Sequence, residues 1–471
     1  MKLQLGNGYF FKPDKTSSMI PLLFLVTYII RHGLDFTGLD IESELKNFSQ
    51  ITDHSNPNSP KFNQRYYEVT KNYVEGGPVI LYVGGESDVF KIKGNSTTDV
   101  ITTYAQDLGA IVIHLEHRYF GESWPTSTST VEDYKYLTVE QALADLKYFQ
   151  EEYSKEHKIE NSKWLIIGGS YPGLLSALAR EVYPKNFHAA ISSSGVVLAT
   201  DDYKDFDLQV AVSMGQECAA AARHTRILID QLMEDESTKS YVKEMFNASL
   251  LTDMNFRFLI GELFTIGIQY DNVELICGPI VDALKTGDDP IAALAKINRE
   301  YFIPEICNGD IARTYSDEVL IELANTNRNA SSRSWLWMTC NELAYWQTAS
   351  GRLSLRSPKL DKQAFQDQCT NVFGAGVTPK VDEFNRKYGG LQQNATRVYY
   401  TTGSQDPWTW TCVTEESGVP KGSIAHTITG HNIGHCDDLV SPYENEPIDL
   451  TRTRKHMREV IKVWMAEDDD E

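Results

Sequence analysis

The chain has 471 residues, of which 41% are hydrophobic, so it is long enough to bury a large core. Its formal net charge of −21 argues against nucleic acid or an anionic membrane as a partner. The seven cysteines are too few for a disulfide scaffold and form no CxxC or other zinc pattern, so we expect no metal and no cofactor.

Residues 1–32 have the features of a secretion signal. Twelve largely apolar residues, 19–30, follow Lys12 and Lys15. This run is too short to span a bilayer comfortably but has the length of a signal-peptide core, so we expect no stable membrane span. The residues before it are long for such a signal, so either translation starts at Met19 or the signal is atypical. A buried strand or helix is the alternative interpretation.

Five N-glycosylation sequons also favour the secretory pathway, with a lysosomal, vacuolar or secreted destination. They begin at Asn47, Asn95, Asn247, Asn329 and Asn394.

The first strands are predicted after a polar arm. Residues 33–60 are rich in Asn, Ser and Pro and are interpreted as a connecting arm. Residues 62–67 are aromatic with partial alternation, and residues 78–83 form an apolar run that ends in Gly84, Gly85 and Glu86. A glycine-rich loop after an early strand is where an α/β-hydrolase places its second oxyanion donor. A simple strand-to-loop turn explains this piece equally well.

A second buried strand, residues 110–115, precedes a dense charged block at 116–123. Such a block is either an ion-pair network that fixes a loop or a rim that faces substrate, and we favour the network. Helical periodicity over 137–153 and an apolar run from residue 189 continue the alternation of strands and helices. That alternation predicts a mostly parallel sheet covered on both faces.

The segment around Ser170 predicts a nucleophile elbow. An apolar strand over 164–169 ends in two glycines, and Ser170 is followed by helical apolar spacing. Such a turn holds the serine in a strained conformation, and the first helical N–H, that of Tyr171, points to where an oxyanion forms. Pro172 stands where the pattern G-x-S-x-G has its second glycine, and proline is tolerated in a first helical turn.

Residues 201–385 change to long helical stretches without convincing strands and contain five of the seven cysteines. We interpret them as a helical cap inserted over the active edge of the sheet. An independent downstream domain is disfavoured because strand patterns resume afterwards. The predicted organisation is a signal-like segment at 1–32, the first part of an α/β-hydrolase domain at 33–200, the cap at 201–385 and the second part of the domain at 386–471.

Candidates for an acid and a base follow the two last predicted strands. Asp406 lies just beyond the strand at 397–403, and His431 and His435 lie beyond the strand at 424–430. The order serine, acid, histidine is that of α/β-hydrolases, where an imidazole takes the serine proton and a carboxylate orients the imidazole. Asp437 and Asp438 are rivals for the acid, and His431 competes with His435. An amphipathic helix over 452–465 closes the chain.

Several blocks together resemble the serine carboxypeptidase family that contains lysosomal Pro-X carboxypeptidase, dipeptidyl peptidase II and thymus-specific serine protease. They are residues 62–86, Glu116 to Ser123, Gly168 to Pro184, Gly403 to Trp408 and His435 to Leu439, and the similarity extends from about residue 55 to 465. The resemblance implies Ser170, Asp406 and His435 as catalytic residues.

The resemblance further implies an exopeptidase that acts on peptides next to proline, either from the carboxyl end or by releasing dipeptides. It suggests disulfides Cys340–Cys369 and Cys218–Cys277. Because the number of cysteines is odd, at least one cysteine is either a free thiol or is bonded to a second chain in a homodimer. Ser87 stands where the family often has glycine, so the resemblance does not fix the second oxyanion donor, and the backbones of Gly85 and Glu86 are the candidates for it. A lipase or esterase on the same fold and an inactive binding homologue are the alternative functions.

Overall fold

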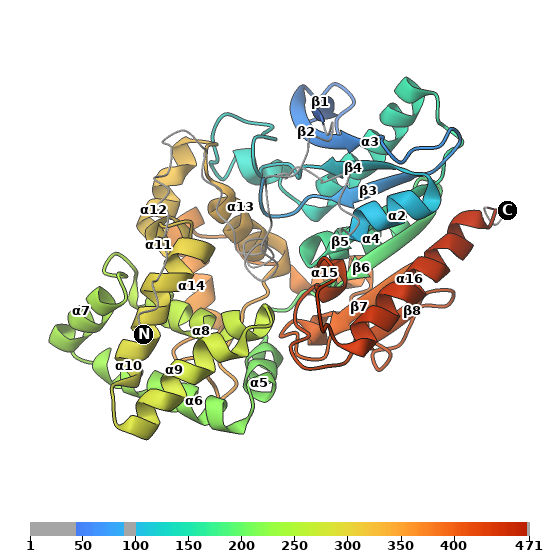
Figure 1. Cartoon of the computed structure of the whole chain (residues 1–471). Helices are drawn as coiled ribbons and strands as arrows, with labels where there is room; N and C mark the ends of the chain where they lie inside the picture. The colour runs from blue at the N-terminus through green and yellow to red at the C-terminus, as the bar shows by residue number, and fades with distance from the viewer. Residues whose placement is uncertain (1–43, 89–99, 469–471) are drawn as a thin grey trace, which may run out of the picture.

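The computed structural model describes residues 44–88 and 100–468, so the signal-like segment and the sequon at Asn95 lie outside the described residues. Within these ranges one eight-stranded sheet has the order β1-β2-β4-β3-β5-β6-β7-β8 (Figure 1). The first two pairs, β1 with β2 and β2 with β4, are antiparallel, and the remaining neighbours are parallel. The strands are β1 Glu44–Ile51, β2 Lys61–Val69, β3 Val79–Val83, β4 Ile111–Leu115, β5 Trp164–Gly169, β6 Ala189–Ser193, β7 Val398–Gly403 and β8 Ile424–Ile428.

The sheet is covered on both faces because its central strands are apolar at successive positions. Leu81 and Ile166 point to one face and pack with helices α3 Val139–His157 and α4 Tyr171–Val182. Ile80 and Leu165 point to the other face and pack with α2 Val100–Leu108 and α16 Ile448–Ala466 (Figure 1). Parallel strands with helices on both faces and a serine at the turn after β5 are the α/β-hydrolase fold, as the sequence predicts.

Strand β1 corrects the sequence interpretation. Residues 33–60 were interpreted as a connecting arm, yet Glu44–Ile51 pair with Lys61–Val69 along their whole length. β1 is the edge strand, and most of its side chains are exposed or half-buried, so its sequence has no apolar run. Its one buried residue, Gln50, hydrogen-bonds Gln64 and the carbonyl of Asp145.

Between β6 and β7 the described chain is helical and contains no strand. These helices lie beside the sheet in Figure 1, and their apolar side chains join the core on the α3 and α4 side. They are α5 Lys204–Ser213, α6 Gln216–Leu232, α7 Glu236–Met245, α8 Asp253–Gln269, α9 Val273–Thr286, α10 Pro290–Ile297, α11 Ile311–Tyr315, α12 Asp317–Glu322, α13 Ser331–Met338, α14 Lys362–Phe373 and α15 Val381–Tyr388. Two short π-helical segments, Asn298–Ile306 and Thr339–Leu343, follow α10 and α13.

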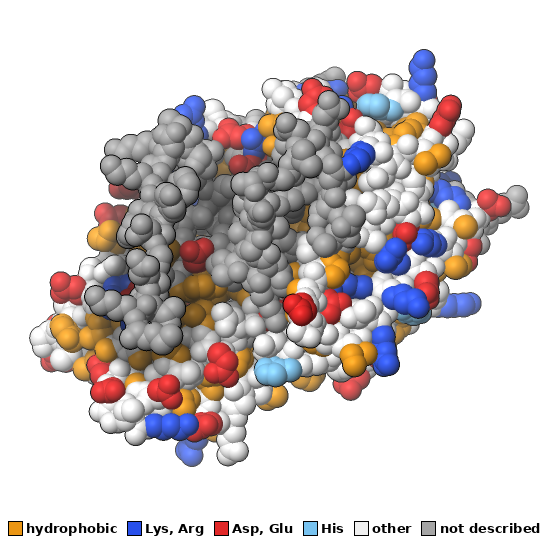
Figure 2. Space-filling view, viewed as in Figure 1, with side chains coloured by type: hydrophobic (Ala, Val, Ile, Leu, Met, Phe, Trp, Pro, Cys, Tyr) orange, Lys and Arg blue, Asp and Glu red, His pale blue; other side chains and the backbone are white. Residues whose placement is uncertain are grey.

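The surface reflects the composition of the chain. Acidic side chains are spread over the helical region in Figure 2, and basic ones gather on the right, where α16 carries the exposed Arg452, Lys455 and Lys462. The four sequons in the described ranges, at Asn47, Asn247, Asn329 and Asn394, all have exposed asparagines. Among residues 44–88 and 100–468 no helix is long and apolar enough to cross a membrane.

Candidate active site

Ser170 occupies a sharp turn between β5 and α4. Its backbone has φ 63° and ψ −128°, a combination that residues with a side chain rarely adopt. The turn is possible because Gly168 has no side chain, which lets the strand and the helix approach each other very closely. A Cβ on Gly168 would lie 2.0 Å from the carbonyl oxygen of Pro172. The Ser170 N–H donates to the carbonyl of Ser193 at 2.9 Å, which ties the turn to the end of β6. Ser170 therefore stands in the geometry of a nucleophile elbow.

Asp406 lies in the loop after β7 and is fully buried. Its Oδ1 accepts the Trp408 N–H at 2.9 Å, and Thr402 Oγ1 donates to its Oδ2 at 3.3 Å. Both oxygens also face the imidazole of His435, at 3.0 Å and 2.8 Å from Nδ1. The carboxylate can thus fix the tautomer that leaves His435 Nε2 able to accept a proton.

His435 lies in the loop after β8, and only 2% of its side chain is exposed. Burial alone would lower the pKa of this imidazole, but the Asp406 carboxylate, together with Cys436, more than offsets burial and raises that pKa well above its usual value. The next residue also meets the elbow, because a Cβ on Gly169 would lie 3.0 Å from Cys436 Sγ. The loop that carries His435 therefore packs against the turn that carries Ser170, and His435 is paired with Asp406.

The rival residues have other surroundings. His431 is exposed, whereas His435 is buried. Asp438 Oδ1 accepts the Ser193 hydroxyl at 2.5 Å, and the carbonyl of Asp437 accepts from Arg454 Nη2 at 2.6 Å. These contacts fix the loop that carries His435. Neither of them pairs Asp437 or Asp438 with an imidazole.

The oxyanion candidates lie against the first turn of α4. Tyr171 is the first residue of that helix, whose opening N–H groups have no intrahelical acceptor. Gly85 packs on the same turn, since a Cβ there would lie 2.7 Å from Pro172 Cγ. Glu86 follows, and burial raises the pKa of its carboxyl to about 7, although attraction to His435 opposes the shift. Its Oε1 is buried and has no hydrogen-bond partner among the described residues.

The charged block after β4 forms an ion-pair network, as the sequence analysis favours. Arg65 donates to both oxygens of the fully buried Glu116, at 2.6 Å and 2.9 Å. Arg118 is also fully buried and donates to Asp145 from Nε at 2.6 Å and from Nη2 at 2.5 Å. Between these residues, His117 Nε2 hydrogen-bonds the Tyr171 hydroxyl at 2.9 Å. The network thereby supports the residue next to Ser170.

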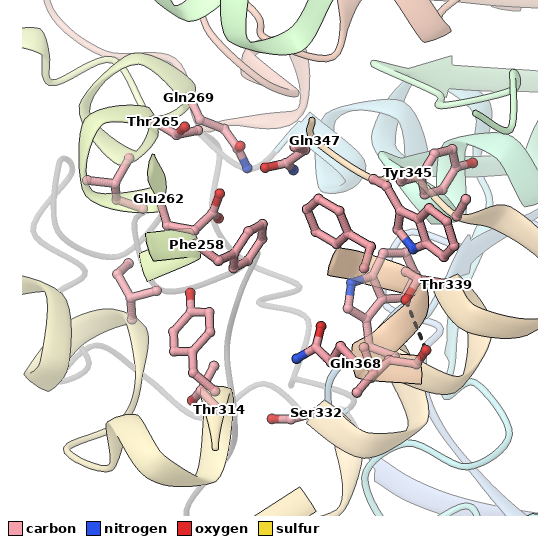
Figure 3. A pocket seen from close by; sticks show the side chains of 18 of the residues that line it. Phe258, Glu262, Thr265, Gln269, Thr314, Ser332, Thr339, Tyr345, Gln347 and Gln368 are labelled. Carbon is pink, nitrogen blue, oxygen red and sulfur yellow. Dashed lines mark hydrogen bonds between the residues drawn. The ribbon is translucent and has the colours of Figure 1, made fainter. Parts of the chain in front are cut away.

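A pocket lies within the helical region and reaches Trp408 in the loop after β7. It has about 1060 Å³ of empty space, counting its opening to solvent. Figure 3 shows side chains from α8, α13 and α14 pointing into it. Its aromatic wall meets the site: Trp408 Nε1 donates to Gln269 Oε1 at 3.2 Å, and the rings of Tyr345 and Trp408 are 5.7 Å apart. The sequence does not predict this pocket, because the spacing of the aromatic residues in the helical region does not indicate where they pack.

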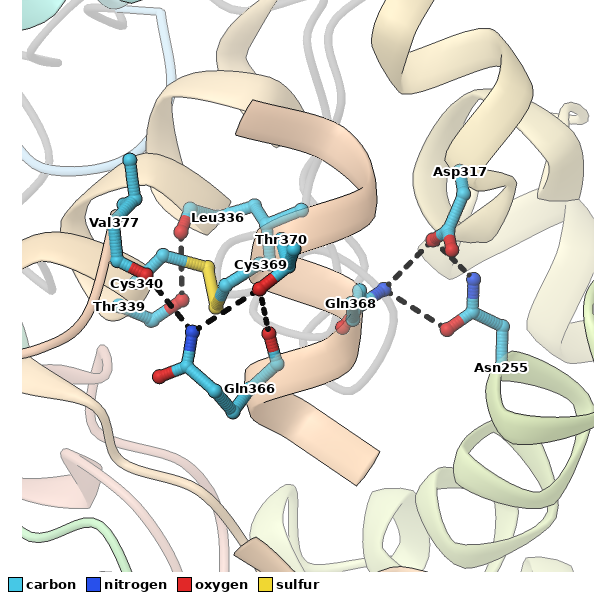
Figure 4. Close-up of a disulfide and its surroundings, with 10 residues drawn as sticks. All are labelled: Asn255, Asp317, Leu336, Thr339, Cys340, Gln366, Gln368, Cys369, Thr370 and Val377. Carbon is cyan, nitrogen blue, oxygen red and sulfur yellow. Dashed lines mark hydrogen bonds between the residues drawn. A yellow bond between two sulfur atoms is a disulfide. The ribbon is translucent and has the colours of Figure 1, made fainter. Parts of the chain in front are cut away.

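Two disulfides brace the helical region, and both pairings agree with those that the resemblance suggests. Cys218–Cys277 joins α6 to α9, and Cys340–Cys369 joins the segment after α13 to α14 (Figure 4). The second bond lies next to Thr339, which lines the pocket. Cys307, Cys412 and Cys436 are free thiols.

Comparison with known proteins gives consistent relatives. The family model described as "Serine carboxypeptidase S28" matches residues 50–457. A protein named probable serine protease EDA2, from Arabidopsis thaliana, is 34% identical over 89% of this chain and 88% of its own length. Thymus-specific serine protease from Mus musculus is 28% identical, and the match covers 86% of this chain and 84% of that protein. A protein named probable extracellular serine carboxypeptidase, from Arthroderma benhamiae, is 28% identical, and the match covers 79% of this chain and 59% of that protein.

Proposed function

Because the chain belongs to the serine carboxypeptidase S28 family and is a serine-type peptidase, we propose that Ser170, His435 and Asp406 form its catalytic triad. The observation that carries this proposal is the pair of short contacts between His435 Nδ1 and Asp406 beside the elbow. A buried carboxylate in that position stabilises the imidazolium that forms when a serine is deprotonated.

The mechanism is acyl transfer through a covalent ester. Ser170 Oγ attacks the peptide carbonyl while His435 Nε2 takes the hydroxyl proton. The Tyr171 N–H and the main-chain N–H of Gly85 or Glu86 bind the oxyanion. His435 then gives its proton to the leaving amine, the amine departs, and a water molecule repeats the same steps on the acyl-enzyme.

We further propose that the enzyme is an exopeptidase that cleaves next to proline. The family resemblance carries this preference, and the aromatic wall of the pocket supports it, because a compact apolar proline ring packs well against aromatic side chains. Trp408 and Tyr345 are such side chains, and both are buried. Neither an esterase nor an inactive homologue is favoured, since the relatives found are named as proteases and carboxypeptidases.

The place of action that we propose is the secretory pathway, either a lysosome-like compartment or the cell exterior. Two disulfides form stably only in an oxidising compartment, and the exposed sequons can accept glycans there.

Peptide turnover tests the proposed function. Purified enzyme is incubated with peptides that carry proline next to the last residue, with peptides that carry it at the second position, and with alanine versions of both. We expect release of one C-terminal residue or of an N-terminal dipeptide, with kcat/KM at least about 10-fold higher for proline. The Ser170→Ala variant should fold with an unchanged Tm and be inactive. Turnover of short esters without any peptide turnover would replace the peptidase assignment by an esterase.

A further inference from the structure

Ser193, the last residue of β6, contacts the segments that carry Ser170 and His435. Its main-chain carbonyl accepts the Ser170 N–H at 2.9 Å, which holds the turn of the proposed nucleophile. A Cβ on Gly173 would lie 2.9 Å from the same oxygen, so the start of α4 also packs against it. The Ser193 hydroxyl donates to Asp438 Oδ1 at 2.5 Å, three residues beyond His435. One fully buried residue therefore bonds the turn of the nucleophile with its main chain and the loop of the base with its side chain.

Ser194 adds a second bond between the end of β6 and the same loop. Its hydroxyl oxygen accepts the Cys436 N–H at 3.0 Å, one residue beyond His435. Its own N–H donates to the carbonyl of Thr401 in β7 at 2.7 Å. Ser194 has φ 44°, in the left-handed region that residues with a side chain rarely adopt, and such a conformation persists only where surrounding contacts hold it. The end of β6 is thus a firmly held support for the loop of the base.

Arg454, on α16, holds the turn that follows the proposed base. Its Nη2 donates to the carbonyl of Asp437 at 2.6 Å and to that of Val440 at 2.7 Å, and its Nε donates to the carbonyl of Asp438 at 3.2 Å. A planar guanidinium with several donors fixes the relative positions of its acceptors. The turn is therefore bonded both to α16 and to the end of β6. Loss of a single bond at the end of β6 should move this loop without unfolding it.

Substrate can reach neither partner of the bond between Ser193 and Asp438. Ser193 is fully buried, Asp438 is 1% exposed, and neither residue lines the pocket. The groups that raise the pKa of His435 are the Asp406 carboxylate and Cys436. An effect of the bond on catalysis must therefore come through the position of the imidazole relative to the nucleophile, because neither substrate binding nor the charge of the imidazole depends on it directly.

We propose that Ser193 is a positioning residue, which sets the distance between Ser170 and His435 by bonding the first through its carbonyl and the loop of the second through Asp438. The proposal rests on the triad proposed above. Transfer of the serine proton to the imidazole is sensitive to distance, and a displacement of about 1 Å can cost about 100-fold in rate. Loss of the Ser193 hydroxyl should therefore slow acylation and leave substrate binding unchanged.

Steady-state kinetics on a peptide that wild-type enzyme cleaves test the proposal. Ser193→Ala should lower kcat by about 10- to 100-fold and keep KM within about 2-fold. Asp438→Asn keeps an oxygen that can accept the Ser193 hydroxyl, so its kcat should stay within about 3-fold of the wild-type value. Ser176→Ala is the matched control, because it also removes a fully buried hydroxyl that donates to a main-chain carbonyl, that of Ile191 at 2.7 Å. It should lower Tm as Ser193→Ala does but keep kcat.

Two further measurements separate positioning from a general structural role. The acidic limb of the pH profile of kcat/KM should stay at its wild-type pH in Ser193→Ala, because Asp406 still faces His435. A shifted limb would assign the loss to the Asp406–His435 pair and overturn the proposal. Ser193→Ala combined with Asp438→Ala should cost no more kcat than the more damaging single change, since both remove the same bond. Losses that multiply would also overturn it.

The rate at which a fluorophosphonate labels Ser170 separates this proposal from the proposed function. Labelling should be about 10- to 100-fold slower in Ser193→Ala than in wild type, and slower still in His435→Ala. A wild-type rate in Ser193→Ala, with slow labelling in His435→Ala, refutes the positioning role alone. A wild-type rate in His435→Ala overturns the triad and the positioning role with it. Should Ser193→Ala fail to fold, Ser193→Cys keeps the size of the side chain but donates only weakly, so a wild-type kcat in that variant would refute the proposal.

Discussion

The main-chain carbonyl of Gln269, the last residue of α8, accepts a hydrogen bond from the main-chain N–H of His435 at 2.9 Å. The Gln269 side chain also accepts from Trp408 Nε1 at 3.2 Å, two residues beyond Asp406. One residue of the helical region thus contacts both the loop of the proposed base and the loop of the proposed acid. Catalytic geometry should therefore depend on how the helical region packs against the sheet.

Replacement of Gly434 tests this dependence. A Cβ at position 434 would lie 2.5 Å from the Gln269 carbonyl oxygen, so Gly434→Ala must push the His435 loop away from α8. Displacement of a catalytic group by about 1 Å can cost about 100-fold in rate, and we expect a loss in kcat/KM of that order. Gly278→Ala is the control, since its Cβ would have no neighbour closer than 3.8 Å and lies in a helix. Normal activity in Gly434→Ala would show that the contact does not position His435.

Glu86 should influence the pH dependence of activity. Burial raises the pKa of its carboxyl to about 7, and the ionised form attracts a proton on His435. Since His435 must be neutral to act as a base, Glu86→Gln should move the acidic limb of kcat/KM to lower pH, by up to about 1 unit. Glu75→Gln, at an exposed position, should leave the profile unchanged. A shift to higher pH would contradict the proposed interaction.

The same carboxyl predicts a pH effect on stability. A raised pKa means that the folded protein favours the neutral acid, so this contribution is present at low pH and is lost as the pH rises through about 7. Glu86→Gln should therefore gain Tm relative to wild type above pH 7 and not below pH 4. Parallel Tm profiles for the two proteins over this range would rule out the shift.

The Cys340–Cys369 disulfide should stabilise the helical region. Its two cysteines are 29 residues apart, and closing a loop of that length stabilises a fold by about 3–4 kcal/mol in the chain-entropy account. The double variant Cys340→Ala/Cys369→Ala should unfold at a lower denaturant concentration and raise KM, because Thr339 lines the pocket. The Cys218→Ala/Cys277→Ala pair, whose cysteines are 59 residues apart, should lower stability slightly more and affect KM less. An unchanged midpoint in both variants would exclude the stabilising role.

The choice between the two histidines can be tested directly. His435→Ala should reduce kcat by about 10⁴-fold or more, because the serine loses its base. His431→Ala should keep near-normal turnover, because that side chain is exposed and the Asp406 carboxylate faces His435. If His431→Ala loses activity and His435→Ala keeps it, the base has been misassigned. Circular dichroism of both variants checks that folding is intact.

Much of the fold follows from local patterns in the sequence. The buried strands β3 to β6 are largely apolar runs followed by glycine, serine or a charged residue, and the turn at Ser170 is predicted by its small neighbours. Asp406 and His435 are predicted from the sequence because each follows a strand, and the structure pairs them with each other. β1 could not be found in this way, because an edge strand with one covered face needs few apolar residues.

The pocket depends on packing that no local pattern records. Its lining residues come from α8, α11, α13, α14 and the segment around Tyr345, together with Trp408 from the loop after β7. These segments are far apart in the sequence, and each is apolar or aromatic in a way that equally fits an ordinary helical core.

Active-site labelling is the most direct test of the proposed triad. Wild-type enzyme is treated with a fluorophosphonate, and the modified peptide is identified by mass spectrometry. We expect one adduct, on Ser170, that forms in step with the loss of peptidase activity. It should disappear in Ser170→Ala and form far more slowly in His435→Ala and Asp406→Ala, since the hydroxyl then lacks its base. Inactivation with an adduct on another residue, or labelling that persists in Ser170→Ala, would contradict the account.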